Sequence, residues 1–405
     1  RAIARNRAGL CAASVTSYLG GFCQEEDVSM EEHDSARITE HFKALNDPRI
    51  QLKTQHKLID IIVITICAVI CGADDWTEIA NYAKAKKEWF KKFLELPHGI
   101  PSHDTFGRVF SLLRPEEFEK CFLSWIHAVF DLTGSQTVAI DGKTLRRSYD
   151  HSSNKAAIHM VGAWATRNGI SLGQRKTEAK SNEITAIPEL LKLLEIKGCI
   201  VTIDAMGCQK EIARQIVDQG ADYVLALKGN QGTIHDDVRL FFEYAQGKQF
   251  KDIPHGSYEV TDGGHGRVEV RRYYTVSDID WLEEKQKWKN LNLIGMVESE
   301  RHIGEKITKE TRYFISSLPN DTKRFAEAVR DHWRIENQLH WVLDIAFRED
   351  DSRVRDRNAA TNLAILRRFA LSLCKQEKTA RVGIKIKRKR AGWDNDYLLT
   401  LLNVG

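Results

Sequence analysis

The sequence predicts an α/β protein in which an all-helical N-terminal domain precedes the sheet and a β-rich insertion interrupts it. Three observations lead to this fold class. Residues 36–133 show helical periodicity throughout, short apolar runs such as "TVAIDGK" and "IVTIDAM" alternate with helical segments from 137 to 230, and the stretch after residue 230 is rich in β-branched and aromatic residues. Strands that alternate with helices are typical of an α/β sheet.

The bulk composition describes an ordinary globular chain. Its 405 residues suffice for two or three domains, with 42% hydrophobic and 29% charged residues. The longest apolar run, Leu58 to Ala73, is too short to span a bilayer and predicts a buried helix. Eight scattered cysteines without a CxxC pair indicate reduced thiols rather than a zinc site. We therefore expect a cytoplasmic protein that has no membrane partner.

The N-terminal part divides into two segments. Residues 1–29 lack a clear period and predict a poorly structured extension, while residues 30–133 predict the helical domain. In "IPSHDTFGRVFSLL", Pro101 and Ser102 mark a helix start. A short helix of this kind is usually structural, but it is also compatible with a DNA-reading helix-turn-helix element. The domain is thus a candidate for DNA binding, and both interpretations stay open.

The following segments alternate between two patterns. Residues 134–230 and 311–375 predict one α/β domain, and residues 231–310 predict a β-rich insertion that forms a sheet of its own. Residues 376–405 form a basic C-terminal segment.

Positive charge is concentrated near the C-terminus. Between Arg353 and Arg390 there are 13 Lys or Arg against two acids, a net charge of +11, which leaves −7 for the rest of a chain of net charge +4. The run is densest in "RVGIKIKRKR", residues 381–390. A solvated tail would explain the run alone, but a local excess in an otherwise acidic chain favours a polyanion, most simply nucleic acid.

Two aspartates stand at the carboxyl ends of apolar strands. Asp141 and Asp204 are each followed by glycine within three positions. One such aspartate alone would most simply cap a turn, but strand ends in open α/β sheets point into the functional crevice. Two of them with a third carboxylate could hold two Mg²⁺ ions for phosphodiester chemistry.

The third carboxylate is expected on a helix over residues 332–347, "HWRIENQLHWVLDIAF". Its period predicts an apolar face with Ile335, Leu339, Val342, Leu343 and Ala346, and a polar face with Glu336, Asn337, His340, Asp344 and Arg348. Glu336 and Asp344 are eight residues apart, about 12 Å along a helix. They cannot share one metal pair, and Glu336 near the helix start is the better candidate. His340 is expected to contact DNA or to form a structural hydrogen bond.

Trp333 and Trp341 lie on the same polar side of this helix. Tryptophans there favour the wall of a site over a solvated surface, and either ring could stack on an unpaired base.

Motifs along residues 36–400 resemble the DDE transposases of bacterial insertion sequences, and among them the H-repeat-associated proteins. They are "VAIDGKTLRRSYD", "KSNEITAIPELL", "TIDAMGCQKEIA", "DYVLALKGNQG", "HGRVEVRRY" and "HWRIENQLHWVLDIAFREDDSRVR". The resemblance implies an RNase H-like catalytic core with a β-rich insertion before the third acid. It also implies that Asp141, Asp204 and Glu336 are the catalytic and metal-binding triad, with Mg²⁺ or Mn²⁺ as cofactor.

The resemblance further implies double-stranded DNA as partner, both the terminal repeats of the element and the target, a homodimer on DNA, and a location at the bacterial nucleoid. Related transposases carry a tyrosine, arginine, glutamate and lysine signature around the last acid. Here the arginine position falls on His332, and the lysine position on Leu343. The residues we expect at the DNA are Lys143, Lys228, Asn230, Arg267, Arg271, Trp333, Arg334, Asn337, His340, Arg348, Arg353, Lys387 and Arg388.

Two functions remain compatible with the sequence. The first is an active transposase that hydrolyses phosphodiester bonds at element ends and transfers the freed strand to target DNA. The second is an inactive H-repeat-associated remnant that only binds DNA. Acids at all three triad positions favour the first.

Overall fold

A mixed sheet of nine strands runs through the part of the chain that the computed structural model describes, which is residues 38–50, 52, 54–129, 136–149, 157–177, 183–264 and 266–402. The predicted extension, residues 1–29, lies outside these ranges. The strand order is β3-β2-β1-β4-β5-β9-β8-β7-β6. β1 pairs in parallel with β4 and β4 with β5, whereas all other neighbours are antiparallel. The α/β class predicted from the sequence is confirmed.

The helices before the sheet are α1 (Ile38–Lys43), α2 (Leu58–Ile70), α3 (Trp76–Ala85), α4 (Lys87–Phe90), α5 (His103–Leu112) and α6 (Pro115–Val129). α2 is buried from Asp60 to Ile70, as its apolar run predicts. The start of α5 is capped by Ser102, whose hydroxyl oxygen accepts a hydrogen bond from the Thr105 N–H.

The first half of the sheet carries β1 (Thr137–Thr144), β2 (His159–Ala165), β3 (Ile170–Thr177), β4 (Ile200–Ile203) and β5 (Asp222–Leu227). Helices α7 (Glu183–Leu191) and α8 (Lys210–Asp218) connect these strands. After the sheet come α10 (Thr322–His332), α11 (Trp341–Phe347), α12 (Arg357–Gln376), α13 (Ile384–Trp393) and α14 (Asn395–Leu402). α12 contacts α2, α5, α6 and β3, so the N-terminal helices and the sheet share one apolar core.

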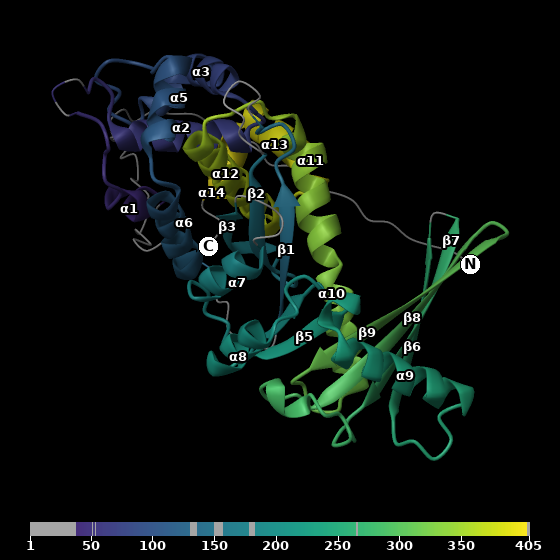
Figure 1. The fold of residues 1–405 in the computed structure, drawn as a ribbon. Coiled ribbons are helices and arrows are strands. Elements are labelled where there is room, and N and C mark those ends of the chain that lie inside the picture. Colours follow the sequence, from purple (N-terminus) through teal and green to yellow (C-terminus); the bar gives the residue numbers. More distant parts are fainter. Residues whose placement is uncertain are drawn as a thin grey trace, which may run out of the picture. The chain divides into compact units, whose positions relative to one another are not determined.

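The predicted β-rich insertion differs from expectation in two ways. Its first part is a helix, α9 (Thr233–Gly247), and its strands β6 (Gly256–Gly264), β7 (Arg267–Val276), β8 (Leu293–Ile303) and β9 (Lys306–Ser316) continue the main sheet (Figure 1). The prediction of a separate sheet was wrong because β9 pairs on both edges. Its second half lies antiparallel to β5, with Leu227 opposite Tyr313, while its whole length pairs with β8.

The predicted helix over residues 332–347 is also divided. α10 ends at His332, a π-helical turn covers Glu336–His340, and α11 begins at Trp341. The predicted apolar face is buried at Ile335, Leu339, Leu343 and Ala346. Figure 1 shows α10 and α11 following one another beside β1. None of the helices in the described ranges is both long and apolar enough to cross a membrane.

Candidate active site

Asp141 and Asp204 occupy equivalent places on neighbouring parallel strands. Ile140 of β1 lies opposite Ile203 of β4, and each aspartate is the next residue. Since paired strands lie about 4.8 Å apart, the two residues meet at one end of the sheet. The Asp204 carboxylate accepts a hydrogen bond of 3.0 Å from the backbone N–H of Met206, which fixes its orientation.

Glu336 reaches this end of the sheet from the π-helical turn. The N–H of Trp341 donates to the carbonyl oxygen of Glu336, five residues earlier, instead of the four of an α-helix. Such a turn contains one residue more than an α-helical turn and is frequent at functional sites. It turns Glu336 and His340 toward Asp141: His340 Nδ1 lies 3.5 Å from Glu336 Oε2 and 3.6 Å from Asp141 Oδ2.

All three acids line one cavity of about 600 Å³. Its walls come from the ends of β4 and β5, from the middle of β9 and from the last turn of α10. The cavity is lined by Asp141, Thr202, Ile203, Asp204, Ala205, Val224, Ala226, Leu227, Lys228, Gly229, His235, Glu310, Thr311, Arg312, Tyr313, Phe314, Val329, His332, Trp333 and Glu336. Asp344 is not among them, as its position along the helix predicts.

The electrostatics of the cavity follow from how deeply each carboxylate lies. Burial is the main cause that raises the pKa of Asp141, which is about 6; the nearby Glu336 and Asp204 carboxylates also raise this pKa, whereas His340 lowers it. Glu336 is half-exposed, and the nearby His340 ring lowers its pKa. Burial also lowers the pKa of His332 to about 4, so this ring is neutral at pH 7.

This donor set fits a divalent metal ion. Carboxylates crowded in a partly dry cavity repel one another, and a bound cation removes that repulsion. Among the described residues, Asp141, Glu336 and His340 place one potential ligand atom each within 4.8 Å of the others. Asp204 adds further carboxylate oxygens on the adjacent strand.

A family model for the transposase DDE domain matches residues 132–373, and a model for the region associated with that domain matches residues 39–126. The chain belongs to the DDE transposase family. The H repeat-associated protein YhhI of Escherichia coli (strain K12), named as a transposase, is 40% identical over 90% of this chain and 97% of its own length. YncI of Escherichia coli O157:H7, also named as a transposase, is 43% identical over 90% of this chain and 94% of its own length.

A solved piggyBac transposase synaptic complex with hairpin DNA aligns over 91% of this chain and 77% of that chain. The TM-score is 0.39 at 13% sequence identity, a similarity too low to show a shared fold.

The residues expected at the DNA of this DDE transposase fall into several groups, the first of which borders the cavity. Lys228 is exposed at its rim, and Asn230 donates a hydrogen bond of 3.0 Å to the Ala205 carbonyl, which ties the loop after β5 to the loop after β4. Trp333 is 40% exposed, and the Arg312 guanidinium lies 4.5 Å from its ring centre. Arg312 was not predicted from the sequence, since nothing in "TRYF" separates it from other strand arginines.

Neighbouring polar residues on the same helical stretch are held by local partners. Arg334 forms an ion pair with Asp331 at 3.0 Å, and the Asn337 amide lies 3.4 Å from the Trp333 carbonyl oxygen. Both side chains are exposed and remain within reach of a ligand that lies along the helix.

Lys143 does not point freely into the cavity. Its ammonium lies 2.7 Å from Asp344 and 3.4 Å from Asp350, and its side chain is almost buried. These two carboxylates therefore join the end of β1 to α11 and to the turn that follows it.

A second group lies away from the acids. Arg267 is exposed near the tip of the β6–β7 hairpin, whereas Arg271 is largely buried in ion pairs with Asp262 and Glu269. Arg348 and Arg353 border another groove of about 800 Å³, whose opposite wall is formed by α3 and α5.

The structure corrects the expectation that Lys387 and Arg388 contact DNA. Lys387 is buried and forms an ion pair of 3.0 Å with Glu377, and Arg388 is buried against Asp74 at 3.3 Å. Arg388 also donates to the Val69 carbonyl at 2.8 Å. Both cations hold α13 on the core, so neither offers a surface to a phosphate, and we withdraw them as DNA contacts.

Gly142 packs against a buried pair of side chains, His159 and Glu183, that the sequence analysis missed. His159 and Glu183 are both buried and joined by a hydrogen bond of 2.6 Å, and His159 is also bonded to Thr144 at 2.8 Å. A Cβ atom at Gly142 would collide with both side chains. This buried histidine–glutamate pair therefore requires glycine directly after Asp141.

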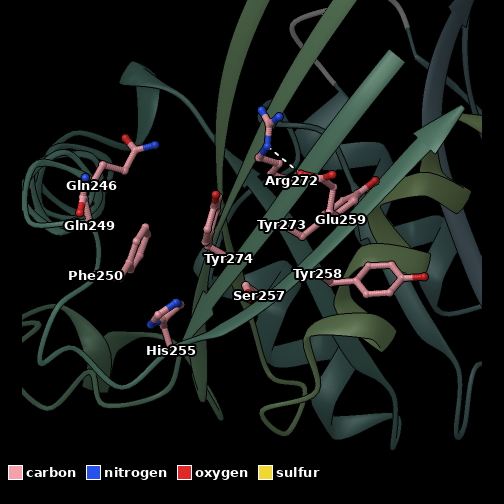
Figure 2. A pocket seen from close by; sticks show the side chains of 10 residues that line it. All are labelled: Gln246, Gln249, Phe250, His255, Ser257, Tyr258, Glu259, Arg272, Tyr273 and Tyr274. Carbon is pink, nitrogen blue, oxygen red and sulfur yellow. Dashed lines mark hydrogen bonds and ion pairs between the residues drawn. The ribbon is translucent and has the colours of Figure 1, made fainter. Parts of the chain in front are cut away.

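Another hollow, of about 560 Å³, lies between α9 and the β6–β7 hairpin (Figure 2). Phe250 stacks on Tyr274 with ring centres 4.8 Å apart, and His255 lies against Phe250. Its carboxylate, Glu259, is paired with Arg272 at 2.8 Å. Among the residues that the structure describes, the cluster of potential metal ligands lies at the acidic cavity and not in this aromatic hollow, so the acidic cavity is the candidate active site.

Proposed function

We propose that this chain is a DNA transposase that carries out metal-dependent hydrolysis and strand transfer at the ends of an insertion sequence. The observation that carries the proposal is the convergence of Asp141, Asp204 and Glu336 on one cavity from three distant parts of the chain. Membership of the DDE transposase family supports it.

We assign the catalytic core to the RNase H-like fold. Support comes from the order of the first five strands, in which an antiparallel β3-β2-β1 meander continues into the parallel strands β4 and β5. The first acid lies within β1, the second directly follows the neighbouring strand β4, and the third acid lies on the helical stretch that crosses them.

Asp141 is the central residue of the metal site, because it has Asp204 on one side and the Glu336–His340 turn on the other. Asp141, Asp204 and Glu336 would hold Mg²⁺ or Mn²⁺. A pair of such ions activates the attacking oxygen and stabilises the leaving oxygen of a phosphodiester.

The chain's own residues would bind and orient the DNA. Lys228 supplies positive charge at the rim, where a phosphate must pass to reach the acids. Trp333, under the Arg312 guanidinium, offers an exposed ring face on which an unpaired base can stack.

The test is a cleavage assay on a duplex that carries the terminal repeats, with Mg²⁺ or Mn²⁺ added. Asp141→Asn, Asp204→Asn and Glu336→Gln should each abolish cleavage. Asp141→Asn should leave DNA binding intact or stronger, because it removes negative charge beside phosphates. Glu327→Gln is the matched control, since Glu327 lies on α10 but outside the cavity.

Two results would refute the proposal. Cleavage that survives in the three triad variants would place the chemistry elsewhere. DNA binding by the unaltered chain without any metal-dependent cleavage would identify the chain as an inactive remnant.

A further inference from the structure

His340 has an unusual environment for a helix residue. Its side chain is only 8% exposed, and its Nδ1 atom faces two carboxylates, Asp141 and Glu336. These three residues form a cluster whose potential ligand atoms all lie within 4.8 Å of one another.

The distances are too long for good hydrogen bonds, yet the three potential ligand atoms lie within 4.8 Å of one another, close enough to converge on one ion. Nδ1 lies 3.5 Å from Glu336 Oε2 and 3.6 Å from Asp141 Oδ2. Good N–H···O bonds measure about 2.7–3.2 Å, and one ring nitrogen carries at most one hydrogen. Ligands bound at about 2.0–2.2 Å lie roughly 2.8–3.1 Å from one another at octahedral angles and roughly 3.3–3.6 Å at tetrahedral angles.

The π-helical turn supports the same reading. In it, Glu336 and His340 are the first and last residues, and both side chains turn toward β1. Residues four positions apart lie on the same face of a helix, so the turn presents both side chains to β1. The turn therefore brings a nitrogen and an oxygen donor to the same point.

We infer that His340 Nδ1 is a ligand of one ion of the metal pair, together with Asp141 and Glu336. The other ion, between Asp141 and Asp204, would have only oxygen ligands from the protein. The inference rests on the proposed function for the presence of a metal pair. The nitrogen ligand makes the two metal positions chemically different.

The difference predicts a metal preference. Mg²⁺ takes hard oxygen ligands, whereas imidazole nitrogen favours first-row transition ions. The position that contains His340 should therefore bind Mn²⁺ in preference to Mg²⁺, while the position at Asp204 should accept both ions.

The test measures Mn²⁺ bound to the full chain in the absence of DNA. Pulsed electron paramagnetic resonance should detect a directly bound ¹⁴N nucleus in the unaltered protein. His340→Gln should remove this signal and weaken Mn²⁺ binding by at least the roughly 10–100-fold that loss of an outer-shell partner causes. Mg²⁺ affinity should fall less, because glutamine supplies an oxygen.

His332→Gln is the matched control. His332 lines the acidic cavity, but its Nδ1 is bonded to the Thr202 hydroxyl at 3.1 Å, so the nitrogen signal should persist in this variant. The inference is overturned if the unaltered protein shows no bound nitrogen, or if the signal survives in His340→Gln. The first of these results does not depend on the folding of any variant.

Failure of the inference can be told apart from failure of the proposed function. A nitrogen-bound Mn²⁺ in a protein that never cleaves DNA would retain the ligand assignment and refute the activity. Metal-dependent cleavage without a nitrogen ligand would retain the activity and reduce His340 to an orienting partner of the two carboxylates.

Discussion

The exposed Lys and Arg side chains of α13, and of the residues directly before this helix, should supply much of the non-specific DNA affinity of the protein. Of the six basic residues in 381–390, Lys387 and Arg388 are buried, and Arg390 lies over the Tyr397 ring. Arg381, Lys385 and Lys389 are exposed, and no ion pair is formed by them within the described ranges. These three are the residues to neutralise, as a triple glutamine variant.

The magnitude follows from counterion release. Each phosphate contact on duplex DNA contributes about −0.9 to the slope of log affinity against log salt. If all three side chains contact phosphates, their loss should make the slope less steep by about 2.7 units. Sequence preference should stay unchanged, because phosphate contacts position a protein without reading bases.

The assay is fluorescence anisotropy with a labelled duplex at several salt concentrations. A control variant neutralises Lys285, Lys287 and Lys289, which removes the same charge from the segment between β7 and β8. Equal slopes for the test variant and the unaltered protein would show that 381–390 is a solvated surface. Equal losses in the two variants would mean that net charge, not local contact, sets the slope.

Two further predictions concern stability. Gly142→Ala should destabilise the fold by about 1–3 kcal/mol, because the new Cβ displaces the buried histidine–glutamate pair. Gly263→Ala is the control and should not destabilise the fold, because the space around Gly263 is open. Chemical denaturation measures the free energy of unfolding of both variants. Burial of Glu377 opposes ionisation, but hydrogen bonds from Thr379, Lys387 and other donors lower its pKa to about 2. Its stabilising effect is therefore complete above its ordinary pKa near 4.5 and is lost toward pH 2. The melting-temperature deficit of Glu377→Gln should accordingly shrink over that range, and a constant deficit would contradict the reasoning.

The sequence predicted those parts of the candidate site that depend on local pattern. Asp141 and Asp204 each end an apolar run, and the position of a residue at the end of a strand is encoded by its immediate neighbours. The exclusion of Asp344 needed only the rise of a helix. Glu336 was chosen partly for its place near a helix start, yet the helical stretch begins at α10 and Glu336 begins the π-helical turn within it.

The features that were missed depend on distant partners. Lys387 and Arg388 belong to the most basic run in the chain, and their burial is decided by Glu377 and by Asp74, more than three hundred residues from Arg388. Periodicity shows that a cation alternates with apolar residues. It does not show whether a carboxylate from another segment of the chain lies close enough to form an ion pair with that cation. The π-helical turn was missed for a related reason. A turn with one additional residue can be built from the same residue types as an α-helical turn, so the sequence does not distinguish the two.

The continuity of the sheet has a consequence for how the insertion can act. The first half of β9 is exposed and pairs only with β8, while its second half is buried between β8 and β5. Glu310 to Phe314, at the junction of these halves, line the acidic cavity. The strand that carries Arg312 is therefore both an insertion strand and a wall of the site. A duplex held along the exposed part of β6–β9 would be linked to the acids through hydrogen-bonded strands, not through a flexible loop. Separate sheets, as expected from the sequence, would have lacked this hydrogen-bonded connection.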